Sequence, residues 1–339
     1  MMNSCFKLTV RCFTYNHYSY VQDTMNGFCK QQTGFPYICL IVDDASNDDA
    51  QTIIKNYFET NFERVDSNHQ LETEDYYFCY GVHKTNRNCF FAVFLLKYNH
   101  YRKKKDKKKY LREWLDNTQY HAFCEGDDYW TDPFKLQKQV DYLDAHPECG
   151  FVYSDFTCVN TKNEVDEEAQ KRYDKCRQLS KSGYLFDYCF LNDGFILTCT
   201  ICYRSSLFDE QQASSIDTSL FMTLARQSSA YYMPEVTACY RINPESWMHT
   251  RLKFIMDITF QIKYDQFYYA YRYKDTTAKY YFTSPESKRN FPIMYTYCVL
   301  YIMKGKVKGL KKLLYVTLKS PRLLILLPFN LFKVITHKN

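Results

Sequence analysis

The stretch "FCEGDDYWTDPFKLQKQVDYL", from Phe123 to Leu143, contains an acidic cluster between an apolar segment and a helical pattern. It places Glu125, Asp127 and Asp128 within four residues, directly after an apolar segment. Adjacent carboxylates repel one another, so the cluster makes sense if a positive group sits beside it. Short carboxylates on this frame can hold a hard divalent cation, which keeps water ligands and takes others from substrate phosphates.

The alternative explanation for the acidic cluster is a capped turn that leads into the next helix. Asp132 and Pro133 already form a helix start, however, with Asp as the N-cap and Pro at the first helical position. Leu136, Val140 and Leu143 then give one apolar helix face. The three earlier acids are not needed as caps, and the sequence therefore favours a site over a turn.

Strand-like and helix-like segments alternate ahead of this stretch. Two apolar strands are predicted at 5–13 and 37–42, and a third runs from Tyr120 into the acidic cluster. Apolar residues at helical spacing follow the first two strands, at Val21, Met25 and Phe28 and at Ile54, Tyr57 and Phe58. This alternation predicts an α/β domain with a mostly parallel central sheet and flanking helices.

The segments after the acidic stretch give further predictions. We expect strands at 149–156, 195–204 and 232–242, a helix at 217–226, a polar loop at 160–182 and helical segments from about residue 250. The run "RKKKDKKK" at 102–109 is predicted as a solvated loop or helix face. A nucleic-acid patch is the alternative, but no aromatic-basic platform or binding motif supports it, so no nucleic-acid partner is expected.

Polar side chains follow three of the predicted strands. Thr14, Tyr15 and Asn16 follow the first strand, Asp43 and Asp44 follow the second, and the acidic cluster follows the third. Ligands of open α/β sheets bind at the carboxyl ends of the strands, so these segments predict a shared site. For Asp43 and Asp44 alone, an Asx-turn after the strand would explain the residues equally well.

Composition narrows the class of protein. A chain of 339 residues, 46% of them hydrophobic, suits one large or two small folded domains. The 15 cysteines are scattered, and the one C-x-x-C, Cys199 to Cys202, falls in a predicted buried strand, so a reducing cytoplasm is expected. The N-terminus shows no secretory signal pattern, and no window reaches the roughly 18 apolar residues of a spanning helix. We expect a soluble protein, or one attached to a membrane surface.

Residues 304–339 carry the basic character of the chain. Nine of the 44 Lys and Arg residues lie there, and none of the 38 Asp and Glu residues. The segments "LKKLLYVTL" and "PRLLILLPFNLF" are basic and apolar together, which is the composition of a helix that rests on anionic lipid. The alternative is a helix that packs on the rest of the protein with its lysines in water. We expect a helical tail in peripheral contact with the inner face of the cytoplasmic membrane.

With these pieces in view, the chain resembles the family 2 glycosyltransferases with a GT-A fold, of the bacterial type that assembles surface polysaccharides. The resemblance rests on "FTYNHYSYV", "IVDDASNDD", "CEGDDYWTDPFKLQKQVDYL", "ILTCTICYR" and "MPEVTACYRI", which occur in the family's order. It implies a catalytic domain at 1–250, with a nucleotide-sugar half at 1–130 and an acceptor half at 131–250. Residues 251–339 would then form a helical C-terminal extension.

The resemblance also implies a site for a nucleotide-diphosphate sugar, with uridine as the expected nucleotide. Thr14, Tyr15 and Asn16 would line the nucleotide pocket, and Asp43 or Asp44 would contact the base. The expected acceptor is a hydroxyl of a glycan or of a lipid-linked molecule. The implied enzyme is a hexosyl- or hexosaminyltransferase.

By the same resemblance, the acidic cluster would hold Mn²⁺ or Mg²⁺ against the diphosphate. Asp127 is the expected direct ligand, and Glu125 and Asp128 would help through the ribose, the metal or its waters. Trp130 would wall the sugar pocket on the acceptor side, although packing explains it equally well. Trp247 matches an aromatic residue that the family often carries near the acceptor.

The family takes its catalytic base from an Asp at the start of a helix in the second half, and Asp217 matches that position. The base would remove the proton of the acceptor hydroxyl in an inverting transfer. Many members have Glu or Gly before this Asp, whereas this chain has Ile216. Asp217 is also a good N-cap for the predicted helix, and a carboxylate can serve in both ways.

Two other functions stay open. A nucleotidyltransferase on a related fold would also use acids and Mg²⁺, but no Gly-rich triphosphate loop follows the first strand. A non-catalytic membrane-surface binding protein could keep the fold without transfer, and Ile216 and the lysine-rich run are compatible with that. Release of pyrophosphate would identify the first, and metal-dependent donor turnover would exclude the second.

Overall fold

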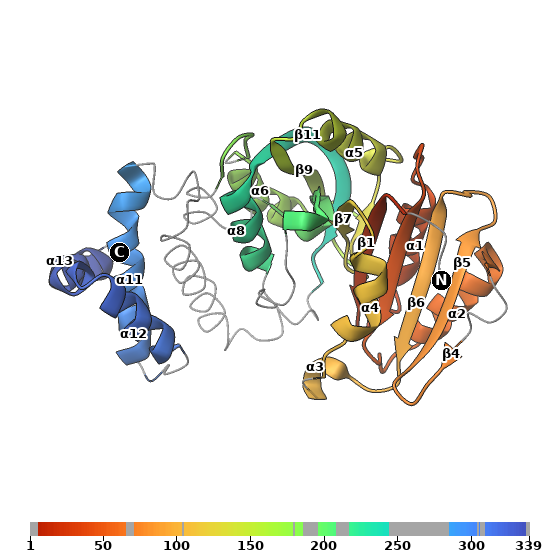
Figure 1. Ribbon diagram of the computed structural model, residues 1–339, viewed down its shortest axis with the longest axis horizontal. Helices are drawn as coiled ribbons and strands as arrows, with labels where there is room; N and C mark the ends of the chain where they lie inside the picture. Colours follow the sequence, from red (N-terminus) through yellow and green to blue (C-terminus); the bar gives the residue numbers. More distant parts are fainter. Residues whose placement is uncertain are drawn as a thin grey trace. The chain divides into compact units, whose positions relative to one another are not determined.

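The computed structural model describes residues 6–65, 71–103, 105–178, 180–185, 196–207, 217–243, 285–303, 305 and 309–336. The chain forms two compact units, drawn in Figure 1. The first unit holds residues 1–181, 194–207 and 231–243, and the second holds residues 182–193, 208–230 and 244–339. The sheet that ends in the predicted polar segments lies in the first unit, and the C-terminal helices lie in the second.

Four neighbouring strands at the centre of the sheet run parallel. Their order is β6 (Cys89–Leu96), β2 (Tyr37–Asp43), β1 (Leu8–Thr14) and β7 (Tyr120–Phe123). Every residue of β2 is buried, because helices cover both faces of this part of the sheet. A strand covered on both faces needs a continuous apolar run rather than an alternating one, which is the pattern that "YICLIV" has.

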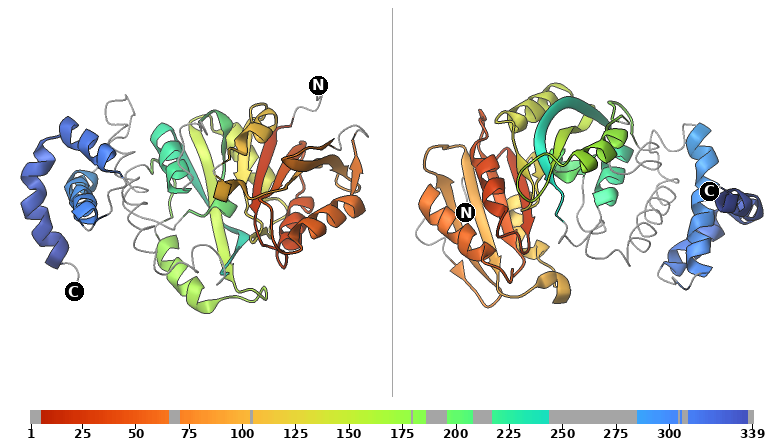
Figure 2. Two further views of the ribbon diagram at one scale, coloured as in Figure 1. Left: turned by 90° about the horizontal axis from the view of Figure 1, so that it is seen from below. Right: turned by 180° about the vertical axis from the view of Figure 1, so that it is seen from behind.

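Antiparallel strands extend the sheet on both sides, so that it has eleven strands and is mixed (Figure 2). Beyond β6 lie β5 (Tyr76–His83), β3 (Phe62–Arg64) and β4 (Leu71–Glu72). Beyond β7 lie β10 (Cys202–Arg204), β9 (Cys149–Val159), β11 (Ser229–Arg241) and β8 (Tyr129–Trp130). The predicted α/β fold is confirmed, and its parallel part is the block of four central strands.

The predicted apolar helix faces are also confirmed. Helices α1 (Val21–Cys29), α2 (Ala50–Asn61) and α5 (Lys135–Ala145) share one hydrophobic cluster with β1 and β2. Helix α4 (Lys108–Leu115) belongs to a second cluster that includes the other face of β2. The lysine-rich run is therefore partly loop and partly helix, since α3 (His100–Lys103) covers its first two residues and α4 begins within it.

The predicted start of α5 was wrong by two residues. The helix begins at Lys135, and Phe134 occupies the N-cap position without a side-chain cap bond. Asp132 instead forms a turn ahead of the helix, where its Oδ1 accepts the N–H of Phe134 at 2.8 Å and its Oδ2 pairs with Lys138 Nζ at 2.9 Å. A short Asp side chain can bond the backbone two residues on, which resembles a cap in sequence.

Two further predictions need correction. The segment 160–182, predicted as a loop, contains α6 (Glu167–Arg177), whose Ala169 packs with Phe156 and Cys158. A helix that is polar almost all round carries little periodic signal. The strand predicted at 195–204 is confined to β10, because residues Thr198–Thr200 form a 3₁₀ turn in which Thr200 Oγ1 donates to the carbonyl of Leu197.

The second unit contains the predicted helix α8 (Asp217–Gln227) and three helices near the C-terminus. These are α11 (Pro285–Met303), α12 (Leu310–Lys319) and α13 (Arg322–Thr336). No helix in the described part of the chain is long and apolar enough to cross a membrane. The predicted domain boundary at residue 250 and Trp247 lie outside the described residues.

Candidate functional site

Three polar segments meet at the carboxyl edge of the parallel strands. In the register of β1 and β2, Thr14 pairs with Asp43, so the two strands end side by side. The N–H of Asp44 donates to the carbonyl of Thr14 at 3.0 Å. The N–H of Gly126 donates to the carbonyl of Phe13, also at 3.0 Å, which brings the acidic segment to the same edge. The predicted segments therefore lie together.

Gly126 permits the close approach of the acidic segment to the loop after β1. A Cβ atom at this position would lie 2.5 Å from Thr14 Oγ1 and 3.1 Å from His17 Nδ1. The first distance is shorter than any ordinary contact, so a larger residue would push the two loops apart. A glycine between the acids is thus required by packing within the protein.

Two buried polar atoms at this edge have no hydrogen-bond partner among the described residues. They are Thr14 Oγ1 and His17 Nδ1. The other ring nitrogen of the histidine, His17 Nε2, lies 3.5 Å from Asp127 Oδ2. Because nearly all buried polar atoms in proteins are paired, two unpaired atoms beside a carboxylate indicate a place for a ligand or a water. His17 directly follows the polar segment 14–16 but was not among the predicted site residues.

The three acids of the cluster occupy different environments. Asp128 is buried, and its Oδ1 accepts the backbone N–H of Arg241 at 2.8 Å. Burial, followed by the nearby charges of Asp127 and Glu125, raises the pKa of Asp128 well above its usual range. Glu125 accepts a bond from Thr198 Oγ1 at 2.8 Å. The Asp127 side chain keeps part of its solvent access, with 17% of its surface exposed.

Arg241, at the end of β11, holds the acidic segment in place. Its side chain has no exposed surface, and its Nε donates to the backbone carbonyl of Asp127 at 2.8 Å. Its guanidinium also pairs with Asp23 at 3.2 Å and lies 4.5 Å from the centre of the Tyr20 ring. These contacts fix the backbone of Asp127 and leave its carboxylate available. No pattern in the sequence indicates this role, since Arg241 lies more than 100 residues away along the chain.

Residues of the "WTDPFKLQKQ" segment hold the 3₁₀ turn that contacts Glu125. Trp130 is 3% exposed, and its Nε1 donates to the carbonyl of Cys199 at 2.8 Å. Gln139 bonds the carbonyl of Thr200 and also accepts a bond from Lys135 Nζ, both at 2.8 Å. These contacts hold the 3₁₀ turn whose Thr198 bonds Glu125. Of the two alternatives for Trp130, its burial favours packing.

Lys135 is buried, and no carboxylate of the described residues forms an ion pair with it. Its Nζ lies 4.5 Å from the centre of the Trp130 ring and bonds the amide oxygen of Gln139. Burial lowers the pKa of Lys135 from 10.5 to about 8, because a charged amine loses its hydration in the interior. The Lys135 amine therefore lies in the core, against Trp130 and Gln139.

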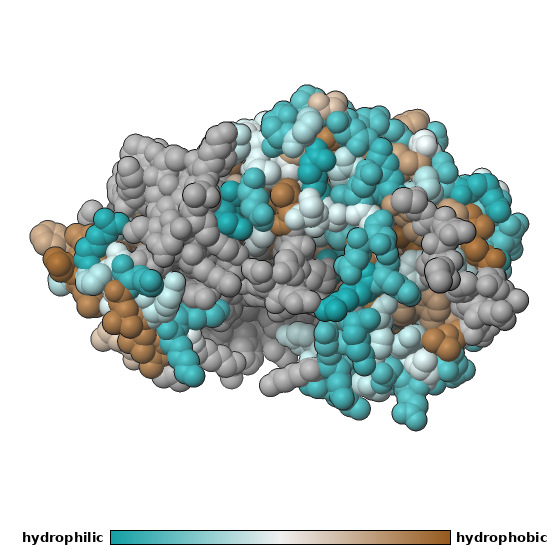
Figure 3. Space-filling model, in the orientation of Figure 1, coloured by the Kyte–Doolittle hydropathy of each residue, from teal (hydrophilic) through white to brown (hydrophobic). Residues whose placement is uncertain are grey.

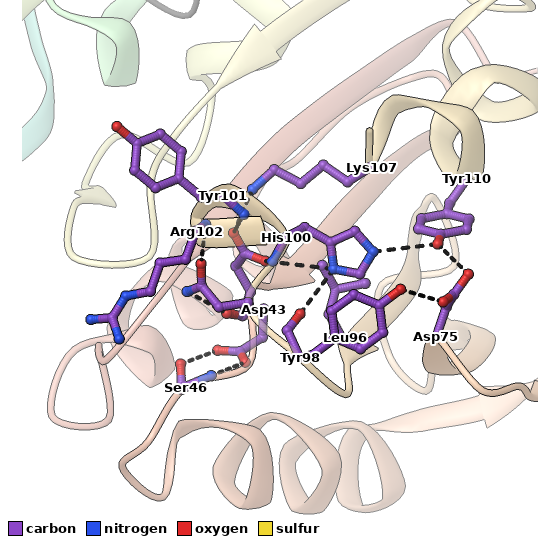
Figure 4. Close-up of polar contacts among 12 residues, drawn as sticks. Asp43, Ser46, Asp75, Leu96, Tyr98, His100, Tyr101, Arg102, Lys107 and Tyr110 are labelled. Carbon is purple, nitrogen blue, oxygen red and sulfur yellow. Dashed lines mark hydrogen bonds and ion pairs between the residues drawn. The ribbon is translucent and has the colours of Figure 1, made fainter. Parts of the chain in front are cut away.

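Asp43 and Asp44 both take part in structural hydrogen bonds. Asp43 accepts the N–H of Ser46 at 2.9 Å and the Nε2 of Gln51 at 2.7 Å, and it also bonds Ser46 Oγ (Figure 4). Burial raises the pKa of Asp43, and these bonds oppose the rise. Asp44 accepts the N–H of His100 at 2.7 Å and that of Tyr101 at 3.1 Å, so it caps α3. Asp43 therefore forms a local turn after the strand, but it bonds the backbone three residues on, whereas the Asx-turn considered for this pair bonds two residues on.

The lysine-rich segment folds back on the same edge. Lys107 Nζ lies 3.2 Å from Asp44 Oδ2 and 4.9 Å from the centre of the Phe13 ring, and the Arg102 guanidinium lies 5.9 Å from the centre of the Tyr15 ring. Figure 4 shows Lys107 and Arg102 near Tyr101. Positive side chains therefore lie beside the polar segment 14–16.

A buried network anchors this segment. His100 has no exposed surface, and its ring nitrogens contact the carbonyl of Tyr98 at 2.9 Å and the hydroxyl of Tyr110 at 3.3 Å. Asp75 accepts the hydroxyls of Tyr98 and Tyr110 (Figure 4). These two bonds lower the pKa of Asp75 to about 2.

Asp217 is the first residue of α8, in the second unit. The residue is exposed at the surface, yet the protein around it removes enough hydration to raise the pKa of its carboxyl from 3.8 to about 6. A carboxylate with such a pKa can exchange a proton near neutral pH.

The described residues fit a divalent ion only in part. Among them, no group of three or more His, Cys, Asp or Glu side chains is arranged to hold a metal. Asp127 and Glu125 are half-buried and keep part of their solvent access, whereas Asp128 is buried. Mg²⁺ is commonly bound by one or two carboxylates together with water and substrate phosphates. The arrangement therefore fits an ion that arrives with a phosphate ligand, with Asp127 as its protein ligand.

The chain is similar to several known sequences and structures. Residues 11–70 match the model of glycosyl transferase family 2. Uncharacterised proteins of Mycobacterium tuberculosis and Mycobacterium bovis are each 28% identical to the chain over 246 residues. The match covers 72% of this chain and 61% of those relatives.

Two solved structures are similar to this chain over most of its length. S. aureus TarS in complex with UDP-GlcNAc has a TM-score of 0.50 and 14% identity, and covers 91% of this chain and 79% of its own. The mannosyltransferase PcManGT from Pyrobaculum calidifontis, in complex with GDP-Man and Mn²⁺, has a TM-score of 0.50 and 13% identity, and covers 98% and 86%. The chain has the GT-A fold, and the family match supports a family 2 glycosyltransferase.

Proposed function

We propose that this protein is a metal-dependent, inverting glycosyltransferase that uses a nucleotide-diphosphate sugar. The observation that carries the proposal is the pair of unpartnered buried atoms, Thr14 Oγ1 and His17 Nδ1, beside the accessible carboxylate of Asp127. They lie at the carboxyl edge of the parallel strands, where ligands of this class of sheet bind. The complexes of TarS with UDP-GlcNAc and of PcManGT with GDP-Man and Mn²⁺ support the choice of ligand.

The donor would lie across the three polar segments. Thr14, Tyr15 and Asn16 would line the nucleotide pocket, and Arg102 near the Tyr15 ring adds a positive charge there. The base contact assigned to Asp43 or Asp44 must coexist with the two or more bonds that each carboxylate already accepts. Asp127 would hold the ion, while Glu125 and the buried Asp128 would shape its loop.

The transfer itself needs a base and a leaving group. Asp217 would take the proton of an acceptor hydroxyl, whose oxygen attacks the anomeric carbon of the sugar. The bond between that carbon and the phosphate oxygen breaks at the same time, and the nucleoside diphosphate leaves with the electron pair. A bound Mn²⁺ or Mg²⁺ supplies charge stabilisation for the departing diphosphate.

We also assign the transferred sugar, the acceptor and the extent of the catalytic domain. We take the transferred group to be a hexosyl or hexosaminyl unit from a UDP-sugar, and the acceptor to be a hydroxyl of a glycan or a lipid-linked molecule in surface polysaccharide synthesis. Residues 1–250 would form the catalytic domain. The chain spans 61% of the length of its curated relatives, so we propose these assignments for this chain and not for the full length of those relatives.

The proposal is tested by thermal stabilisation of the purified protein. UDP, GDP, CDP and dTDP are each added with and without Mn²⁺, because a ligand that binds the folded state raises the melting temperature. We expect one diphosphate to raise it, more strongly with Mn²⁺. Asp127→Asn should lose the Mn²⁺-dependent part, whereas Asp141→Asn, a matched change at a different acid on α5, should keep the full shift.

Other outcomes identify other functions. Stabilisation by a nucleoside triphosphate, with pyrophosphate released in the presence of a sugar phosphate, would replace the proposal by a nucleotidyltransferase. The absence of a shift with every diphosphate would leave a binding protein without transfer. A shift that Asp127→Asn keeps unchanged would contradict the role of Asp127.

A further inference from the structure

The helices α12 and α13 expose large apolar side chains on one connected stretch of chain. On α12, Leu314 and Leu318 are 52% and 79% exposed and lie one turn apart. On α13, Ile325, Phe329 and Phe332 are 76%, 77% and 72% exposed. Their spacing of four and three residues places these three on one face of the helix. Figure 3 shows hydrophobic side chains gathered over this end of the chain.

Helix α13 has its apolar face turned outward. Its polar residue Asn330 is buried, and the side chain of Asn330 bonds the carbonyl of Leu326 in the same helix at 2.9 Å. Leu323, seven residues earlier, is buried on the same side, and α13 packs against α11. A surface helix in water normally shows the opposite arrangement. Outside these helices, exposed apolar residues of the described chain are scattered along the sequence, which needs no partner.

Positive charge accompanies this apolar face. Lys311, Lys319 and Arg322 are exposed around Leu314 and Leu318. The sequence contains no Asp or Glu after Glu286, so no acid of this segment neutralises them. A partner for this surface must therefore be both apolar and negatively charged.

We propose that α12 and α13 lie on the surface of an anionic lipid bilayer, with the apolar face between the acyl chains and the cations at the headgroups. A bilayer of this kind combines the two properties in one plane, and apolar side chains with flanking Lys and Arg are what interfacial helices use. The helices rest on the bilayer and do not cross it, in agreement with their length and composition. This surface does not depend on the sugar-transfer site.

The test is sedimentation of the full-length protein with vesicles. Vesicles of phosphatidylcholine alone are compared with vesicles that also contain phosphatidylglycerol. We expect binding to the anionic vesicles to be stronger by on the order of tenfold or more, and to weaken as salt is added. Ile325→Ser/Phe329→Ser/Phe332→Ser should weaken it by at least about tenfold through loss of apolar burial.

Matched variants distinguish vesicle binding through this surface from nonspecific hydrophobic binding. Val65→Ser/Leu71→Ser/Val165→Ser removes three exposed apolar side chains elsewhere and should bind vesicles like the wild type. Lys311→Gln/Lys319→Gln/Arg322→Gln should lose most of the preference for anionic lipid. All these side chains are exposed, so unchanged circular dichroism and melting are expected in each variant.

Two results would overturn the proposal. One is equal binding of the wild type and the α13 variant to anionic vesicles, or no binding by either. The other is a wild-type dimer, seen by light scattering, that the α13 variant converts to a monomer while neither binds lipid. That result would assign the apolar face to a second copy of the chain.

Discussion

At the scale of single residues, the site depends on buried side chains that position accessible ones. Asp127 and Asp128 are adjacent in sequence, yet one keeps solvent access and the other bonds the backbone of Arg241. The side chain of Arg241 in turn fixes the carbonyl of Asp127. Of the two adjacent acids, Asp127 therefore has an accessible carboxylate, whereas Asp128 shapes the loop.

Arg241→Met is therefore expected to damage both stability and donor binding. The change leaves the carbonyl of Asp127 and the carboxylate of Asp23 without their buried partner, which costs about 2–4 kcal/mol. Urea unfolding monitored by circular dichroism measures the loss. Arg87→Met is the control, since Arg87 forms an exposed ion pair with Glu63 that contributes less than about 1 kcal/mol. Equal losses in the two variants would show that Arg241 has no special role.

Lys135 predicts a pH dependence of stability with a definite sign. Its pKa is about 8 in the folded protein and 10.5 ordinarily, so between these values the unfolded chain binds more protons. The lysine therefore opposes folding most below pH 8, and this cost, up to about 3 kcal/mol, disappears as the pH rises through 10.5. Melting of the wild type and Lys135→Met should show the largest advantage of the variant below pH 8. An advantage that does not change with pH would contradict the assigned shift.

The residue types of the site were predictable, but their environments were not. The sequence identified the three polar segments because each follows an apolar strand. It could not show that Asp128 points inward, because its partner Arg241 is 113 positions away. His17 was missed for a similar reason, since its unpaired Nδ1 becomes visible only when Gly126 packs against it.

At the scale of elements, short helices and turns were the hardest to predict. Helix α6 was missed because, among its residues whose side chains the structure describes, Ala169 alone is deeply buried in the core, which leaves almost no apolar period. Helices with a full apolar face, such as α1 and α5, were predicted from that face. The start of α5 was misplaced because Asp132 makes a local turn two residues ahead of the N-cap.

Asp44 is expected to stabilise α3 before any nucleotide is present. Asp44→Ala removes the acceptor for the N–H groups of His100 and Tyr101, and loss of such a cap costs about 1–2 kcal/mol. Hydrogen exchange of these two amides should become roughly 5- to 30-fold faster. Lys107→Ala keeps the cap and should change the exchange much less. If Asp44 acted only on the nucleotide, exchange in the ligand-free variant would match that of the wild type.

At the scale of the whole molecule, three of the four parallel strands and the long extension strands β9 and β11 were predictable, whereas β6 and the strands beyond it were not. The strands β1, β2 and β7 are apolar runs that end in polar segments, and these two signals coincide at the site. The parallel strand β6 and its antiparallel neighbour β5 lie in a region without clear turn signals, and β8 has only two residues. The second unit includes segments from three parts of the chain, which no local pattern reveals.

The proposed mechanism takes its base, Asp217, from the first residue of α8. If Asp217 is the base, its deprotonated form is required, and its pKa is about 6. The rate of sugar transfer at saturating donor should then fall about tenfold per pH unit below 6 and level off above it. Asp217→Asn should lower this rate by on the order of 100-fold or more while leaving stabilisation by nucleoside diphosphate and Mn²⁺ unchanged. Transfer that survives Asp217→Asn, in a protein that still depends on Asp127, would keep the donor site and remove Asp217 from the reaction.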